Sequence, residues 1–351
     1  MDTVSYQCPN CGGSLIFDPE QQKYHCEYCI SYFTEEELET KAQVKEALAE
    51  KIQAEEATVQ EAEALLYHCP SCGAEIVTDD TTAATFCFYC HNPVVLKGRL
   101  DGEYRPDYVI PFAISREQAL ERFEAWIRNK RFVPKDFYAK EQIEKLSGVY
   151  FPYLLYSCQV EGGIEAGAFQ KRVWRTGNLQ YTETKQYQVS REGTMEVCDV
   201  TRNALKKADR ELIESVLPYH MKEKKPFSMA YLSGFLAEKR DMGKEEFEQE
   251  MKEEVSAYAA MMLKNSISGY DEVEVQSSRI DMTSPKWEYA MMPVWTLTYQ
   301  DETDHIYYFA LNGQTGKICG ELPVDSRKLK LLFAAVFFPV LICLLAVGYL
   351  I

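Results

Sequence analysis

The same cysteine spacing occurs twice in the first hundred residues of this chain. The pattern Cys-x2-Cys-x14-Cys-x2-Cys runs from residue 8 to residue 29 and again from residue 69 to residue 90. Two Cys-x2-Cys pairs can direct four thiolates at one ion, which is the closed tetrahedral shell of structural zinc. The pattern therefore predicts two structural Zn²⁺ ions. The eight predicted ligands are Cys8, Cys11, Cys26, Cys29, Cys69, Cys72, Cys87 and Cys90.

The residues around these cysteines predict zinc ribbons. A proline lies inside the first pair of each set, and Gly12 and Gly73 follow the second cysteine, where a tight turn directs backbone N–H groups at the sulfurs. Apolar stretches between the pairs are expected to form two short strands in each unit. We predict zinc ribbon 1 over residues 1–33 and zinc ribbon 2 over residues 67–97.

Disulfide bonds are the alternative for these cysteines, and they need an oxidising compartment. The residues before Cys8 do not form a basic and apolar signal peptide, so zinc is favoured. His25, His68 and His91 each adjoin a ligand cysteine and could substitute for one, but four thiolates already complete each shell. A complete shell leaves no open position for water or substrate, so both ions are predicted to stabilise the fold and to perform no chemistry.

The charge of the chain argues against nucleic acid as a partner. Asp and Glu number 54 against 38 Lys and Arg, and the formal net charge is −16. Such a surface repels phosphate groups. Neither predicted ribbon carries the basic stripe that phosphate binding requires.

Residues 34–66, between the two ribbons, are predicted to form an acidic helix. Thr34 and Glu37 have the spacing of a capping box at the start of a helix. A thin apolar stripe continues through Leu48 and Ile52 toward Leu66. Two interpretations stay open, a solvated spacer that separates the ribbons or a docking helix for a partner or a second copy.

Residues 104–325 form the part of the chain that is long enough for a sizeable core, and their pattern predicts an α+β domain with a mainly antiparallel sheet. Ser115 is expected to cap a helix, and a hairpin is expected to turn at residues 176–178. The segment Gly313–Lys317 lacks the Walker spacing and is interpreted as a tight turn. No catalytic set is recognised, so we predict that the protein is not an enzyme.

The C-terminus predicts a membrane anchor. Leu331–Ile351 contains no charged residue, and at about 1.5 Å per residue it would extend roughly 31 Å, enough to cross a bilayer. Arg327, Lys328 and Lys330 precede it and, under the positive-inside rule, place the N-terminal bulk in the cytoplasm. We therefore expect a transmembrane tail anchor at 329–351 and a single-pass protein of the cell membrane.

Several of these motifs occur together in one known family. The two Cys-Pro-x-Cys-Gly knuckles, the turn at 312–317 with the following Gly320-Glu321-Leu322-Pro323, and the apolar C-terminus resemble the bacterial TFIIB-type zinc-ribbon membrane proteins. The resemblance implies the same eight cysteines as zinc ligands. It also implies an adaptor role in membrane-stress assemblies, with phage-shock-A-like and SPFH-type proteins as partners.

The expected function is that of a membrane-anchored cytoplasmic adaptor whose ribbons recruit protein partners. One alternative is a membrane-tethered regulator that binds nucleic acid through the ribbons. Another is an enzyme with an unrecognised site in 104–325, because a pocket assembled from distant residues leaves no local sequence signature.

Overall fold

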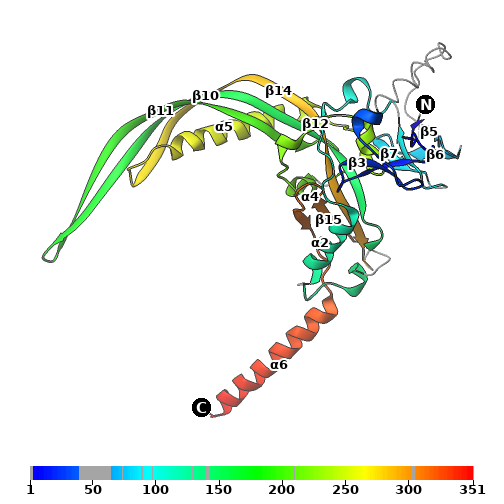
Figure 1. Cartoon of the computed structure of the whole chain (residues 1–351). Coiled ribbons are helices and arrows are strands. Elements are labelled where there is room, and N and C mark those ends of the chain that lie inside the picture. Colours follow the sequence, from blue (N-terminus) through cyan, green and yellow to red (C-terminus); the bar gives the residue numbers. More distant parts are fainter. Residues whose placement is uncertain are drawn as a thin grey trace. The chain divides into compact units, whose positions relative to one another are not determined.

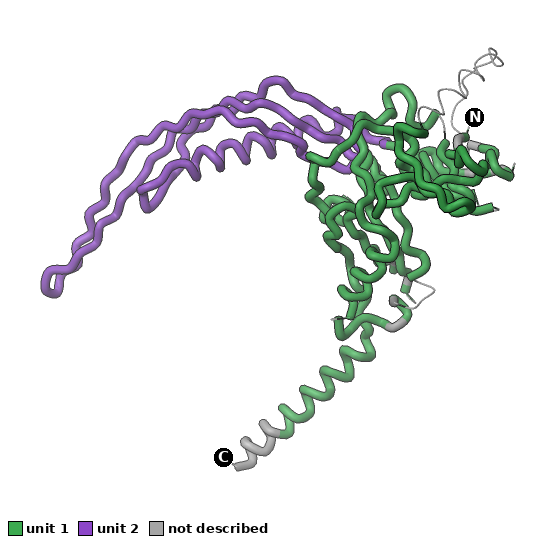
Figure 2. The backbone as a smooth tube through the Cα atoms, viewed as in Figure 1, with its two compact units in different colours: residues 1–152, 205–239, 291–351 green, residues 153–204, 240–290 purple. Residues whose placement is uncertain are grey.

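The computed structural model describes residues 3–38, 65–72, 74–87, 90–96, 98–128, 130–138, 143–208, 210–301 and 305–350. The chain forms two compact units, which are considered separately (Figure 1). Unit 1 contains residues 1–152, 205–239 and 291–351, and unit 2 contains residues 153–204 and 240–290 (Figure 2). The predicted α+β class is confirmed, with a sheet that is mixed and mostly antiparallel.

The strands are β1 (Thr3–Val4), β2 (Leu15–Asp18), β3 (Lys23–Cys26), β4 (Tyr32–Phe33), β5 (Leu65–His68), β6 (Glu75–Thr78), β7 (Thr82–Phe86), β8 (Pro93–Leu96), β9 (Tyr108–Val109), β10 (Ser147–Thr176), β11 (Leu179–Asn203), β12 (Lys225–Pro226), β13 (Leu236–Glu238), β14 (Glu272–Gln300), β15 (Ile306–Asn312) and β16 (Ile318–Gly320). The α-helices are α2 (Arg116–Arg128), α4 (Arg210–Ser215), α5 (Glu248–Asn265) and α6 (Ser326–Leu350). Short 3₁₀ helices are η1 (Gly102–Tyr104), η2 (Lys135–Tyr138), η3 (Met221–Glu223), η4 (Met229–Leu232) and η5 (Lys244–Glu246).

The main sheet has the strand order β1-β8-β7-β13-β10-β14-β15-β16. The pair β10–β13 is parallel, whereas β1–β8, β7–β8, β7–β13, β14–β15 and β15–β16 are antiparallel. In unit 1 an aromatic cluster packs beside these strands. The ring of Phe112 stacks on Phe235 at 4.2 Å between centroids and meets Trp295 at 5.0 Å. Gly313 allows this packing, because a Cβ there would lie 2.6 Å from the Phe112 ring.

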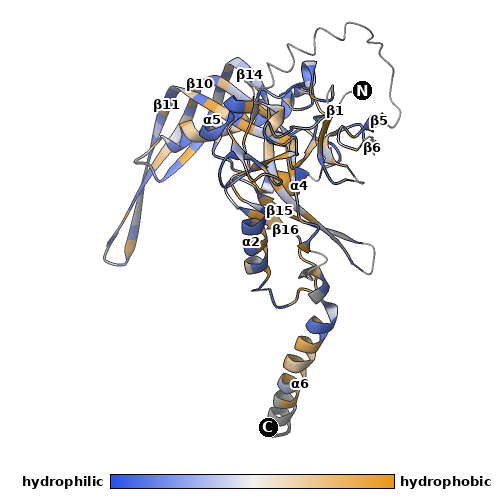
Figure 3. Ribbon diagram, turned by 45° about the vertical axis from the view of Figure 1, so that its right-hand side comes forward, coloured by the Kyte–Doolittle hydropathy of each residue, from blue (hydrophilic) through white to orange (hydrophobic). Residues whose placement is uncertain are grey.

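Unit 2 is a three-stranded sheet, β11–β10–β14, with α5 packed against β11. The predicted hairpin is confirmed, since Thr176 pairs with Leu179 and Gly177 adopts a left-handed φ of 62°. Along β10 the apolar residues 164, 166 and 168 alternate with more polar ones, as a half-buried strand requires. Figure 3 shows both apolar and polar stretches along the strands of this unit. They form a core with Leu263 of α5. The apolar pattern of the sequence predicts separate strands at 150–156 and 168–175 and at 272–280 and 290–299, whereas each pair is one continuous strand in the structure, β10 and β14.

Two predicted helix starts are confirmed by their caps. The Ser115 hydroxyl accepts a hydrogen bond from the Gln118 N–H at 3.3 Å, at the start of α2. Thr34 and Glu37 form the reciprocal capping box, with the Thr34 N–H donating to Glu37 at 2.9 Å and the Glu37 N–H donating to Thr34 at 3.4 Å. Residues 35–38 are helical. The remainder of the predicted spacer helix, up to residue 64, lies outside the described residues.

The prediction of a transmembrane anchor at 329–351 is wrong. Within the described part of the chain, no helix combines the length and the apolar character that crossing a membrane requires. The single-pass topology and the location deduced from it are therefore corrected.

Candidate metal centres

The eight cysteines form two groups of four. Within each group all four sulfurs lie within 4.8 Å of one another. The closest sulfur pairs are 3.4 Å apart in the first group and 3.6 and 3.7 Å apart in the second. A tetrahedral zinc ion with bonds of about 2.3 Å separates its sulfurs by about 3.8 Å. Both groups therefore fit a structural Zn²⁺, and the predicted cofactors are confirmed.

One backbone hydrogen bond recurs in all four Cys-x2-Cys knuckles. The N–H of the first cysteine donates to the carbonyl oxygen five residues later, at distances of 2.6 to 3.0 Å. The bond closes a loop that places the second cysteine beside the first, so local backbone geometry brings the thiols together. The four bonds join Cys8 to Gly13, Cys26 to Ser31, Cys69 to Ala74 and Cys87 to Asn92.

The residue after the second cysteine is left-handed in the three knuckles where it is described. Its φ is 78° at Gly12, 59° at Ile30 and 56° at His91. Each of these residues donates its N–H to the carbonyl of the first cysteine, at 2.8 to 2.9 Å. Gly73, at the fourth such position, lies outside the described residues. Glycine suits this conformation, whereas a β-branched isoleucine is strained in it.

The cysteines of each site differ in exposure and in acidity. Cys8, Cys26, Cys69 and Cys87 are buried, whereas Cys11 and Cys72 are exposed. In the metal-free thiols, the backbone N–H of Gly13 lowers the pKa of Cys11, but hydrogen bonding to Cys26 and desolvation raise it to about 12. Hydrogen bonding to Ser31 lowers the pKa of Cys29 to about 6. Zinc binds thiolates, so metal binding must displace the proton of Cys11.

Ribbon 1 packs against the rest of unit 1 through aromatic side chains. Phe17 and Tyr24 contact the ring of Tyr231, with centroid distances of 5.2 and 6.2 Å. The Ser233 hydroxyl donates to the Leu15 carbonyl at 2.5 Å, and the Phe17 N–H donates to the Ser233 carbonyl at 3.0 Å. The three-stranded sheet β2–β3–β4 is therefore attached to η4 and the residues after it by aromatic contacts and by hydrogen bonds to backbone groups.

Ribbon 2 is divided between two sheets. Its first strands, β5 and β6, pair with each other, whereas β7 and β8 belong to the main sheet. Arg99 follows β8 and is buried, and its guanidinium donates to the Tyr67 hydroxyl at 2.9 Å and to the Asp79 carbonyl at 2.8 Å. The second metal site is thus continuous with the main sheet of unit 1.

A group of exposed side chains beside the first site was missed by the sequence reasoning. Tyr28 is 75% exposed, Ile30 is 73% exposed and Tyr32 is 43% exposed. The Tyr28 ring covers Gly13, where a Cβ would lie 2.5 Å from it, and the Tyr32 ring stacks on His25 at 4.6 Å. The signal available in the sequence was the alternation of large apolar residues from 28 to 32. We call Tyr28, Ile30 and Tyr32 the ribbon surface.

His25, His68 and His91 do not join a metal group among the described residues, where both groups consist of cysteines. His220 and His305 are exposed. The segment Gly313–Lys317 is a turn between β15 and β16, in which the Asn312 side-chain oxygen accepts from the N–H groups of Gln314 and Thr315 at 2.9 and 2.8 Å. The interpretation as a turn is confirmed.

Comparison with known proteins gives one informative likeness. The chain is 31% identical over 334 residues to the uncharacterized protein YdjG of Bacillus subtilis (strain 168), a match that covers 95% of this chain and 94% of that protein. No protein-family model and no solved structure matches the chain.

Proposed function

The chain belongs to the same family as YdjG of Bacillus subtilis, and we propose that it is an adaptor whose zinc ribbons recruit protein partners. The zinc ions have a structural role in this proposal, because four thiolates around each ion leave no coordination position for a substrate. The function then depends on the surface that the ribbons present.

The ribbon surface is the observation that carries the proposal. Tyr28 and Ile30 lie between β3 and β4, Tyr32 lies in β4, and two of the three side chains are about three-quarters exposed. The strained backbone of Ile30 is a second indication, because a left-handed isoleucine costs stability that a glycine at the same position would not cost. A ribbon selected for stability alone would bury these rings or replace them.

The charges around the ribbon surface indicate the chemistry of the partner. Desolvation and the nearby carboxylates of Asp18 and Glu20 raise the pKa of Tyr32, which places both acids close to its hydroxyl. An apolar patch beside two carboxylates favours a partner segment that combines apolar anchors with Lys or Arg. We therefore propose a basic and apolar segment of a protein as the ligand.

The finer assignment, to the TFIIB-type zinc-ribbon proteins, is also part of this proposal. The knuckles and the turn at 312–317 support it. It makes phage-shock-A-like and SPFH-type proteins the first candidates for the partner, and a membrane-stress assembly the first setting in which to look for the complex.

The test compares two variants of the full chain against purified candidate partners by biolayer interferometry. Tyr28→Ser combined with Ile30→Asn removes two anchors, and Asn tolerates the left-handed backbone, so zinc binding should be retained. Tyr308→Ser is the control, because Tyr308 is another exposed tyrosine, 39% exposed, away from the zinc sites. We expect the double variant to weaken binding at least tenfold and the control to leave it unchanged. Equal binding by both variants would refute the proposed surface.

The same preparation tests the nucleic-acid alternative. Fluorescence anisotropy with a labelled duplex should show no binding that weakens steeply with salt. A steep salt dependence that the ribbon variants alter would favour the nucleic-acid regulator over the adaptor.

A further inference from the structure

The strand β11 presents a long open edge. It runs for 25 residues, and among the described residues β10 is the one strand that pairs with it. The register with β10 is regular from Gln159–Glu196 to Thr176–Leu179, without a bulge. Proteins usually protect such an edge with proline, a bulge or a short strand, because its unpaired N–H and C=O groups can pair with another chain. β11 contains no proline and is regular over most of its length.

We propose that β11 is a dimerisation edge that pairs antiparallel with β11 of a second copy of this chain, in the register in which Tyr187 faces Tyr187 of the second copy. The two three-stranded sheets then become one six-stranded sheet. This proposal concerns unit 2 and is independent of the ribbons and of the partner they bind.

The sequence of β11 is complementary to itself in this register. Glu183 faces Arg191 of the second copy, and the same ion pair forms again on the other side of the two-fold axis. Directly opposed opposite charges stabilise an antiparallel pair, whereas like charges destabilise it. Moving the two-fold centre from residue 187 to residue 188 would oppose Lys185 and Arg191, and centring it between these residues would oppose Glu183 and Glu192.

Most other pairs of this register are also compatible, with Lys185 opposite Val189 as the exception. Tyr181 lies opposite Gly193, so a ring covers a strand glycine that lacks a side chain of its own. The exposed Leu179 lies opposite Met195. The face away from α5 carries polar pairs throughout, which are Gln180 with Thr194, Thr182 with Glu192, Thr184 with Ser190, and Gln186 with Gln188.

Reversal of charge tests the register. We would measure the mass of the full chain by sedimentation equilibrium over a range of concentrations, for the natural protein, Glu183→Arg, Arg191→Glu and the double swap. Each single change places like charges opposite each other at both ion pairs, and we expect the dimer Kd to rise about 10- to 30-fold. The double swap restores opposite charges and should return the Kd to within about threefold of the natural value.

Glu196→Arg is the matched control, because position 196 faces Asn178 of the hairpin turn in this register and carries no opposed charge. Its Kd should stay unchanged. Zinc content and circular dichroism establish that each variant is folded. The proposal would be overturned by a natural chain that stays monomeric, by a dimer that the single changes leave intact, or by a double swap that is no tighter than the single variants.

Discussion

Replacement of Ile30 by glycine should strengthen the first zinc site. Ile30 has a φ of 59°, and its side chain is 73% exposed, so little buried surface is lost with it. A left-handed L-residue costs about 1–2 kcal/mol, while glycine adds about 0.5–1 kcal/mol of backbone entropy cost. The difference between these two costs predicts that Ile30→Gly stabilises the folded ribbon by about 1 kcal/mol. Folding and metal binding are coupled in a ribbon, so the zinc affinity should rise about fivefold.

The assay is a competition with a chromophoric chelator on the full chain in a Cys72→Ser background, in which the second site is removed and the first is titrated alone. Ile30→Ala is the control, because alanine loses the side chain but keeps a Cβ in the left-handed backbone. Its zinc affinity should not rise. An Ile30→Gly protein that binds zinc no more tightly than Ile30→Ala would refute the argument from backbone strain. The same glycine variant should bind the partner more weakly, which would show that the strain is retained for function.

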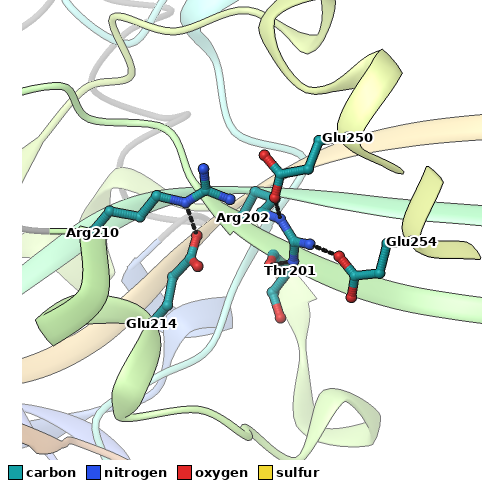
Figure 4. A network of polar contacts seen from close by, with 6 residues as sticks. All are labelled: Thr201, Arg202, Arg210, Glu214, Glu250 and Glu254. Atoms are coloured by element: carbon teal, nitrogen blue, oxygen red, sulfur yellow. Dashed lines mark hydrogen bonds and ion pairs between the residues drawn. The ribbon is translucent and has the colours of Figure 1, made fainter. Parts of the chain in front are cut away.

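Three further predictions concern the metal sites and the packing. Cys11→Ser should reduce the zinc content from two ions per chain to one by removing the first site, and Cys72→Ser should do the same by removing the second site. Elemental analysis counts the ions, and limited proteolysis identifies the site that is lost. Loss of both ions from either change would show that the sites depend on each other. Gly234→Ala should destabilise the attachment of ribbon 1 by at least about 2 kcal/mol in chemical denaturation, because the new Cβ would lie 2.3 Å from Ile16 at a φ of 92°. Gly98→Ala is the control, with a φ of 84° and open space around it, and it should cost about 1 kcal/mol. Arg202→Ala should lower the stability of unit 2 by about 2 kcal/mol, because the largely buried Arg202 pairs with Glu250 and Glu254 (Figure 4). Arg210→Ala should lower the stability of unit 1 by under about 0.5 kcal/mol, because the half-exposed Arg210 pairs with Glu214. Hydrogen exchange measures both losses, and equal losses would contradict the role of burial.

The metal sites were predictable because zinc ligation is local. A knuckle needs two cysteines three positions apart and one backbone bond, and both are encoded within six residues. The caps at Thr34 and Ser115 and the hairpin at Gly177 were predictable for the same reason. Each depends on the chemistry of neighbouring residues.

Features that depend on residues far apart in the chain could not be predicted from the sequence. β7 of the second ribbon pairs with β13 of the main sheet, some 150 residues away. The continuity of β10 was missed because its glycines at 162, 163 and 167 resemble strand ends. Nothing local marks these long-range pairings.

The way ribbon 1 is attached has a consequence for the order of events during synthesis. Its metal site closes over a separation of 21 residues, from Cys8 to Cys29, but the hydrogen bond between Leu15 and Ser233 spans 218 residues. At about 5–20 residues per second, a ribosome needs roughly 10–40 s to make the surface on which the ribbon will pack. During that time Phe17 and Tyr24 have no Tyr231 to cover them. Zinc binding therefore keeps the nascent ribbon folded until the rest of unit 1 has been synthesised.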